Sequence, residues 1–197
     1  SDPSQWSGRS LSSIAMGQEI SATPIQLVRA MSAIANGGRL MKPYVIASVL
    51  NQYGTPVQVM TPQDMQEAIQ PDTAAMMAKI LELAVEKGTG KRAKLEEYRV
   101  AGKTGTAQKF DKEAGAYSSS KVIMSFLGFA PVEHPRLTML VMVDEPHVGK
   151  WGGEIAAPVF KKVAERVLPY LGALPGGTHF IQTASATSGL ASTVVLQ

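Results

Sequence analysis

The chain has 197 residues, which is the length of one domain or slightly more. Hydrophobic residues make up 45% of it and charged residues 18%, a composition typical of a globular protein rather than a disordered or fibrous one. The absence of Cys excludes a disulfide framework, a zinc ribbon and a cysteine nucleophile. The formal net charge of +3 comes from scattered basic residues, so no nucleic-acid partner is indicated.

No targeting or membrane segment is visible in the sequence, because its longest apolar runs are far shorter than the ~20 residues of a spanning helix. The chain does not begin with Met. We therefore expect it to be processed, excised from a longer protein, or to carry a cloning scar.

Apolar periodicity and turn residues divide the chain into helices and strands. Residues 1–23 are polar and rich in Ser, which predicts a loop. Thr23 is a suitable N-cap, and Pro24 suits the first position of a helix. In chain order we expect a helix over 24–35, strands over 44–50 and 56–60, a helix from Pro71 to Gly88, strands over 100–109, 122–130 and 137–145, and a helix over 153–170.

The two strands over 122–130 and 137–145 are separated by a short turn, so we expect them to pair as an antiparallel hairpin. Both strands are almost continuously apolar, which predicts a sheet covered on both faces. The fold class is therefore α+β, an antiparallel sheet flanked by helices. Residues 110–121 are expected to form a polar connection, and residues 172–197 a weakly ordered or appended tail.

Helical spacing also predicts which side chains are buried. For the middle helix these are Met77, Ile80, Leu81, Ala84 and Val85, and for the last helix Ile155, Val159, Phe160, Val163 and Val167. Met76, Met77, Met139 and Met142 fall at core spacing, which favours packing over a soft-metal site.

The strongest short motif is Lys103-Thr104-Gly105-Thr106, on the predicted strand over 100–109. The two Thr hydroxyls can bind a carboxylate, with the charge of Lys103 beside it. Gly105 lets a ligand or another backbone approach the strand closely. A backbone N–H at the end of the motif can stabilise an oxyanion. Such a short motif also fits an ordinary edge strand with a Gly bulge.

Further segments follow one another in an order that makes the motif more specific. Together they resemble the class B penicillin-binding proteins, the division- or elongation-type transpeptidases, over about residues 8–171. These segments are 17–30, 34–38, 102–107, 143–146, 151–153 and 156–160.

The resemblance implies a penicillin-binding-protein/β-lactamase-like fold and a serine D,D-transpeptidase that cross-links peptidoglycan. An active-site Ser would attack the D-Ala-D-Ala end of a stem peptide, and β-lactams would acylate the same Ser. By analogy Lys103 would tune proton transfer, Thr104 and Thr106 would hold the substrate carboxylate beside Gly105, and the backbone N–H of Thr106 would form half of the oxyanion hole. No cofactor or metal is implied.

The chain departs from the family pattern in two of its three catalytic motifs. Among 12 Lys, only Lys121 has a Ser three positions earlier, Ser118. This pair follows the Lys-Thr-Gly strand instead of preceding it, so we interpret it as a chance match to Ser-x-x-Lys. No Ser-x-Asn exists, because Asn36 and Asn51 are preceded at that spacing by Ile34 and Val49.

We therefore expect residues 1–171 to be the C-terminal part of a transpeptidase domain whose nucleophile Ser lies upstream. The chain alone should be inactive. Its partners would be the missing part of its own domain, stem peptides, β-lactams and, through the parent, division or elongation proteins. The resemblance also implies a parent anchored on the wall-facing side of the cytoplasmic membrane.

Other motifs have simpler interpretations. The segment 87–92 fails the P-loop pattern because Arg92 follows Gly-Lys, so it is expected to be a mobile, solvated loop. Asp144, Glu145 and His147 favour a turn over a metal site. Trp151 favours a packed loop over a role at the active-site rim.

Two other functions remain open. One is a non-catalytic binding or sensor module on the same fold. The other is a D,D-carboxypeptidase or β-lactamase relative, although the segments 144–146 and 151–160 favour the transpeptidases.

Overall fold

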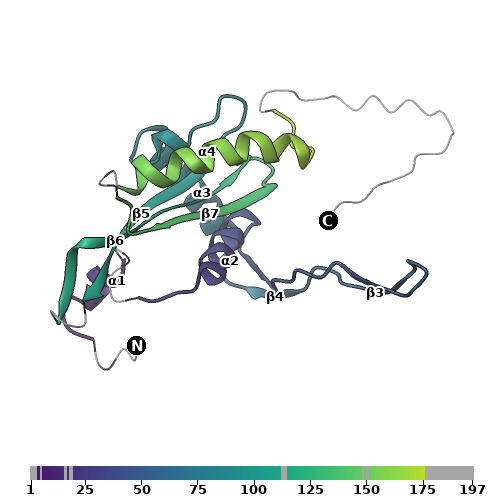
Figure 1. Cartoon of the computed structure of the whole chain (residues 1–197), viewed down its shortest axis with the longest axis horizontal. Helices are drawn as coiled ribbons and strands as arrows, with labels where there is room; N and C mark the ends of the chain where they lie inside the picture. Colours follow the sequence, from purple (N-terminus) through teal and green to yellow (C-terminus); the bar gives the residue numbers. More distant parts are fainter. Residues whose placement is uncertain are drawn as a thin grey trace.

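The computed structural model describes residues 4, 6–15, 17, 20–111, 115–147, 149 and 151–175 (Figure 1). The elements are α1 (Ser10–Ala15), α2 (Pro24–Ala35), β1 (Arg39–Met41), β2 (Ser48–Leu50), β3 (Pro56–Val59), β4 (Asp64–Glu67), α3 (Pro71–Glu86), the 3-10 helix η2 (Lys91–Ala93), β5 (Ala101–Asp111), β6 (Ala116–Ala130), β7 (Leu137–Asp144) and α4 (Gly152–Tyr170).

The centre of the molecule is an antiparallel sheet in the order β5-β6-β7. The predicted hairpin is confirmed, with β6 and β7 paired from Ile123↔Asp144 to Ala130↔Leu137. Helix α4 lies along one face of the sheet and α2 along the other, as Figure 1 shows. The α+β prediction, an antiparallel sheet with helices against it, is therefore confirmed.

Two core clusters occupy the two faces of this sheet. On the α4 side, Phe126 is fully buried and packs edge-to-face on Phe160, with ring centroids 4.8 Å apart. On the α2 side, Phe129 is buried with Met31 and Leu81. Because alternate strand residues point to opposite faces, residues 126 and 129 of one strand can serve both clusters.

The start of α2 forms as the sequence predicts. The Thr23 side chain accepts a hydrogen bond from the Gln26 backbone N–H (3.3 Å), and Gln26 Oε1 accepts one from the Thr23 N–H (2.8 Å). This reciprocal pair is a capping box, and Pro24 follows it at the first helical position.

Two predicted irregular segments instead contain regular structure. Residues 1–23 include the short helix α1, where the Ser10 hydroxyl is buried and accepts from the Ser7 N–H at 3.0 Å. The segment 110–121 is not simply a connection, since β5 extends to Asp111 and β6 begins at Ala116. The Phe110 and Tyr117 rings meet edge-to-face at 5.6 Å across these strand ends. The first part of β6 is rich in Ser and lacks the apolar pattern that predicts a strand. It is a strand because its backbone pairs with β5.

The predicted buried faces of two helices are partly wrong. On α4 the buried residues include Ala156, Ala157 and Ala164, whereas Val159 and Val163 are 43% and 38% exposed. Alanine lets the helix lie close to the sheet, so the smaller side chains occupy the contact. On α3, Ile80 is 53% exposed while Leu81 and Val85 are buried as predicted. Met76 and Met142 are also exposed instead of lying in the core.

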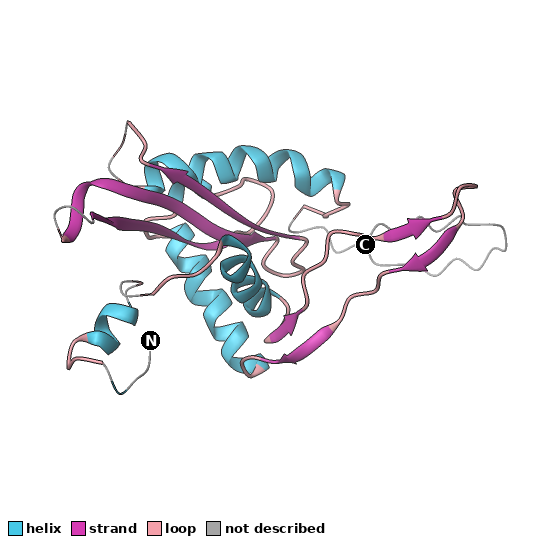
Figure 2. Ribbon diagram, turned by 60° about the horizontal axis from the view of Figure 1, so that its bottom comes forward, coloured by secondary structure: helices cyan, strands magenta, loops and turns pink. Residues whose placement is uncertain are grey.

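The segment between α2 and α3 forms two small antiparallel sheets, β1-β4 and β2-β3. The β2-β3 hairpin is the one predicted from 44–50 and 56–60, although its paired strands are shorter. The β1-β4 pair was not predicted. Figure 2 shows that the β2-β3 hairpin projects away from the body of the molecule. Within the described ranges, no helix is long and apolar enough to cross a membrane.

Candidate functional site on strand β5

The Lys103–Thr106 motif lies in the middle of β5, which forms one edge of the central sheet. On its inner side the motif is paired with β6 from Lys103↔Leu127 to Thr106↔Met124. Among the strands that the structure describes, β5 pairs with β6 alone in this sheet, so its other side carries no neighbouring strand.

The two Thr side chains are held by hydrogen bonds from elements distant in sequence. Thr104 Oγ1 lies 2.7 Å from Thr89 Oγ1, in the loop that follows α3. Thr106 Oγ1 accepts a hydrogen bond from the backbone N–H of Gly152, the first residue of α4, at 3.2 Å. Because that amide fills one acceptor position of Thr106, the Thr106 O–H remains available as a donor.

Two glycines allow the start of α4 to lie this close to β5. A Cβ on Gly152 would clash with the Gly105 carbonyl oxygen and would lie 2.5 Å from the Ser125 carbonyl oxygen. A Cβ on Gly153 would lie 2.5 Å from the Thr89 carbonyl oxygen. The α4 N-terminus is therefore in contact with both neighbours of the motif, the strand β6 and the loop containing Thr89.

Lys103 and Gly105 lie on the opposite face of β5 from the two Thr residues, by strand alternation. Lys103 is exposed, and its Nζ donates to the Thr104 carbonyl oxygen at 3.1 Å. A Cβ on Gly105 would lie 2.5 Å from Ser125 Oγ, so the missing side chain leaves room for that hydroxyl. The motif thus presents a cation and a close-approach glycine on one face and two hydroxyls on the other.

Sequence reasoning missed Thr89, Gly152 and Ser125 as neighbours of the motif. The signals were present in Gly88-Thr89-Gly90 and Trp151-Gly152-Gly153, where small residues permit close contact, but no pattern showed which strand they approach. Within the segment 87–92, expected to be a solvated loop, Gly90 is buried and the other five residues are exposed. The 3-10 helix η2 begins in this segment, at Lys91. Trp151 is 62% exposed, so the prediction of a packed loop aromatic is wrong.

Ser118 and Lys121 each contact other groups near the start of β6, and no contact between their side chains is seen among the described interactions. Ser118 Oγ accepts from the backbone N–H groups of Ser120 and Lys121, at 3.2 and 3.0 Å. Lys121 Nζ lies 3.6 Å from the Asp111 carboxylate. These contacts lie in β6 opposite the register shift between Gln108 and Phe110 of β5. They are consistent with the interpretation of the pair as a chance match to Ser-x-x-Lys.

The two Asn side chains serve the local backbone. Asn51 Oδ1 accepts from the N–H groups of Tyr53 and Thr55 in the hairpin turn, and Asn36 Oδ1 accepts from the Arg39 N–H. These three hydrogen bonds order turns next to strands.

Asp144 and Glu145 form ion pairs with Lys109 on β5. Lys109 Nζ lies 3.1 Å from Asp144 Oδ1 and 2.6 Å from Glu145 Oε1. The hydrogen bond to Glu145, followed by that to Asp144, raises the pKa of Lys109 above its ordinary value. Within the part of the chain that the structure describes, no three His, Asp or Glu side chains are grouped to hold a metal ion.

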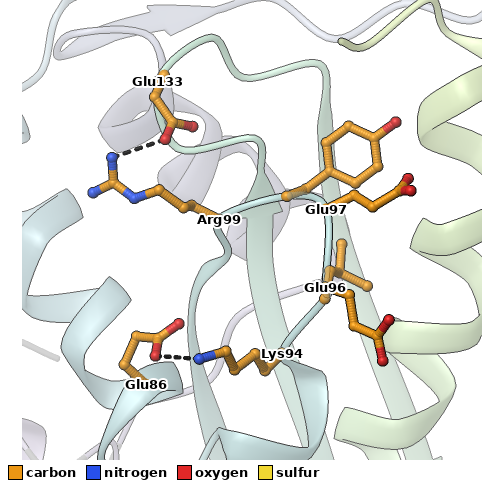
Figure 3. Close-up of a pocket in the computed structure, with 8 residues that line it drawn as sticks. Glu86, Lys94, Glu96, Glu97, Arg99 and Glu133 are labelled. Carbon is orange, nitrogen blue, oxygen red and sulfur yellow. Dashed lines mark hydrogen bonds and ion pairs between the residues drawn. The ribbon is translucent and has the colours of Figure 1, made fainter. Parts of the chain in front are cut away.

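A pocket of about 320 Å³ lies apart from the motif, along residues 94–99 (Figure 3). Its charges are partly paired within the protein: Lys94 Nζ is 2.6 Å from Glu86, and Arg99 is 2.8 Å from Glu133. Arg99 also binds Glu82, and this hydrogen bond raises the pKa of Arg99 further above its ordinary value. Two of its four carboxylates, those of Glu86 and Glu133, are paired with Lys94 and Arg99. Since the pocket contains no residue of the motif, we do not assign it a catalytic role.

Comparison with known proteins identifies the family. Residues 1–165 match the family model of the penicillin-binding protein transpeptidase domain. The chain belongs to the penicillin-binding protein transpeptidase family.

Two relatives show the closeness of this relationship. The chain is 40% identical to stage V sporulation protein D of Bacillus subtilis over 82% of its own length and 25% of the relative's. It is 34% identical to penicillin-binding protein PbpB of Mycolicibacterium smegmatis over 83% of its length and 26% of the relative's. The chain thus spans about a quarter of the length of these two relatives.

The fold matches solved structures of the same family. The apo structure of penicillin-binding protein 3 from Mycobacterium tuberculosis superposes with a TM-score of 0.79 at 29% identity, over 89% of this chain and 41% of that one. The same M. tuberculosis protein in complex with aztreonam also gives a TM-score of 0.79, at 28% identity and with the same coverage. The chain therefore represents part of a penicillin-binding protein transpeptidase domain.

Proposed function

We propose that this chain is the C-terminal part of a serine D,D-transpeptidase domain and carries its substrate-binding strand. The observation that supports this most directly is the Lys103–Thr106 motif on an edge strand, in a chain of this family. The parent would cross-link peptidoglycan stem peptides and would be acylated by β-lactams. The M. tuberculosis relative solved with aztreonam supports the second part of this proposal.

The geometry is consistent with a role for each residue of the motif. A stem peptide would lie along the open edge of β5, where backbone groups can pair with it. The Thr104 and Thr106 hydroxyls would bind its terminal carboxylate, and the backbone N–H of Thr106 would form half of the oxyanion hole. Lys103 would assist proton transfer to or from the nucleophile. Trp151, exposed beside Gly152, would form part of the rim of the site.

The nucleophile must approach Lys103 from a particular side. The face that carries Thr104 and Thr106 is occupied by the start of α4, at Gly152 and Gly153. Lys103 is exposed on the other face. We therefore place the missing Ser-x-x-Lys and Ser-x-Asn motifs in the upstream part of the parent, packed against the Lys103 face of the sheet. In this proposal the parent's membrane anchor also lies outside the chain, and the domain faces the cell wall.

The test uses a fluorescent penicillin and intact-mass spectrometry on two proteins. The 197-residue chain alone should form no covalent adduct, because it lacks the two nucleophile motifs; an adduct on Ser118 or any other Ser would contradict the assignment. The parent protein should be labelled, and Lys103→Ala should slow its acylation by roughly 10²-fold or more.

A matched control is Lys42→Ala, in an exposed Lys directly after β1, a strand that packs with α2 and β4. This variant should leave the acylation rate unchanged. If the parent is not labelled at all, the alternative of a non-catalytic binding module on the same fold is favoured. If the parent is labelled and Lys103→Ala acylates at the wild-type rate, the proposed role of Lys103 is wrong.

A further inference from the structure

The β2-β3 hairpin and the extended segments beside it form an arm, residues 43–63, that projects from the body (Figure 2). None of its 21 residues is Asp, Glu, Lys, Arg or His. Its large apolar side chains are nevertheless exposed, and Val45 is 100% exposed. The others are Tyr44, Ile46, Val49, Leu50, Tyr53, Val57 and Val59. An uncharged apolar surface of this kind marks an interaction site.

Among the described residues, the arm has only the strands β2 and β3, and neither outer edge has a partner strand. An isolated two-stranded hairpin is marginally stable in water, whereas three or more strands are stable. The two edges differ in how well they are protected against pairing with a strand of another molecule. The β3 edge begins with Pro56, and Pro within a strand interrupts pairing. The other edge, residues 44–50, contains no Pro, Gly or charge, so it is open to an added strand.

We propose that two copies of this chain associate through this edge, with the segments 44–50 paired antiparallel about a two-fold axis at Ala47. The result is a four-stranded sheet made from two arms. In this register Tyr44 faces Leu50 and Val45 faces Val49, pairs of aromatic and aliphatic side chains that stabilise antiparallel sheets. Ala47, the smallest side chain of the segment, lies on the axis.

The backbone supports this register. The Ala47 carbonyl oxygen accepts a hydrogen bond from the Met60 N–H at 2.8 Å, so Ala47 is directed toward the β3 side of the hairpin. Since alternate residues of an antiparallel strand direct their N–H and C=O groups to opposite sides, Ile46 and Ser48 direct theirs to the open edge. Centring the pairing on Ala47 brings Ile46 of one copy opposite Ser48 of the other, so their backbone N–H and C=O groups can form hydrogen bonds.

A second copy fits the charge pattern better than a charged partner does. An arm without charges offers nothing to attract an acidic or basic segment. It also does not repel its own copy, because the formal net charge of +3 is carried by other parts of each molecule. The association is therefore expected to depend only weakly on salt.

The first test is sedimentation velocity of the whole chain over a range of concentrations. We expect a reversible monomer–dimer equilibrium. Val45→Lys should weaken the dimer by about tenfold or more, since it places charge at the paired edge. Val45 is fully exposed, so this variant should fold like the wild type. The matched control is Val57→Lys on β3, 64% exposed, which should dimerise like the wild type.

The second test uses the absence of Cys from the chain. Ala47→Cys should form a disulfide-linked dimer under mild oxidation, because residues at the axis of such a pair lie ~4.5 Å apart between Cα atoms, within disulfide range. Val57→Cys is the control and should cross-link much more slowly. A monomer at all concentrations, a dimer unaffected by Val45→Lys, or equal cross-linking of the two Cys variants would each overturn the proposal.

Discussion

Substitution of Gly152 by Ala tests whether the contact between α4 and the Lys103–Thr106 motif is as close as described. A Cβ at this position would meet two backbone oxygens, those of Gly105 and Ser125, the second at 2.5 Å. Neither belongs to a flexible side chain, so the helix end would have to move away from the sheet. Such overpacking costs about 1–3 kcal/mol. The hydrogen bond from the Gly152 N–H to Thr106 Oγ1 would be lost with it, at a cost of about 1 kcal/mol.

We therefore expect Gly152→Ala to lower the free energy of unfolding by about 2–4 kcal/mol. For a chain of this size that corresponds to a drop in Tm of roughly 4–16 °C. Urea and thermal unfolding followed by circular dichroism would measure it. The control is Gly8→Ala, where a Cβ would have nothing within 4 Å and the backbone φ is not positive. If the two variants lose the same stability, α4 does not lie on β5 as described.

Three further predictions concern individual contacts. Thr89→Val should destabilise the chain by about 1 kcal/mol or less, since the Thr89–Thr104 hydroxyl pair is exposed, and Thr89→Ser should restore the wild-type urea midpoint. Burial, and then the charge of Glu97, raise the pKa of Tyr98, whose hydroxyl donates to the Ala173 carbonyl oxygen. The stabilisation from the neutral Tyr98 side chain is complete below the ordinary tyrosine pKa of ~10 and is lost as the pH rises through the pKa of the folded protein. Tyr98→Phe should therefore flatten the alkaline part of a plot of unfolding free energy against pH. An unchanged alkaline part would exclude Tyr98 as its source. Phe126→Ala should cost about 3–5 kcal/mol in urea unfolding, and a loss below about 1 kcal/mol would mean that the ring is not in the core.

The main elements of the body were predictable because each carries a local signal. The strands 122–130 and 137–145 are apolar runs separated by a turn with two Pro residues, and their pairing is confirmed. The capping sequence at Thr23 marked the start of α2, which is also confirmed. These features depend on residues close together in the chain, so the sequence alone contains the information.

The features that were missed depend on how closely distant segments approach. On α4, Ala156 and Ala164 are buried, whereas Val159 and Val163 are exposed. The close helix–sheet contact favours small side chains, and side-chain hydrophobicity alone does not predict this. The β1-β4 pair joins residues on the two sides of the arm, and no local pattern shows that segments so far apart in sequence pair with each other. The outer part of β6 is polar, so only its ladder with β5 shows that it is a strand.

The motif illustrates both situations. Its four residues were found from sequence, but their arrangement depends on contacts 15 and 46 residues away, at Thr89 and Gly152. These contacts bind the Thr104 and Thr106 hydroxyls on the α4 face of β5, while Lys103 is exposed on the other face. Because backbone and hydroxyl groups of the chain itself fix the Thr side chains, the half of the proposed site present here is ordered without its nucleophile. In the proposed parent, the upstream segment would need only to place Ser and its base against the Lys103 face, and a stem peptide added along β5 would lie between the two halves.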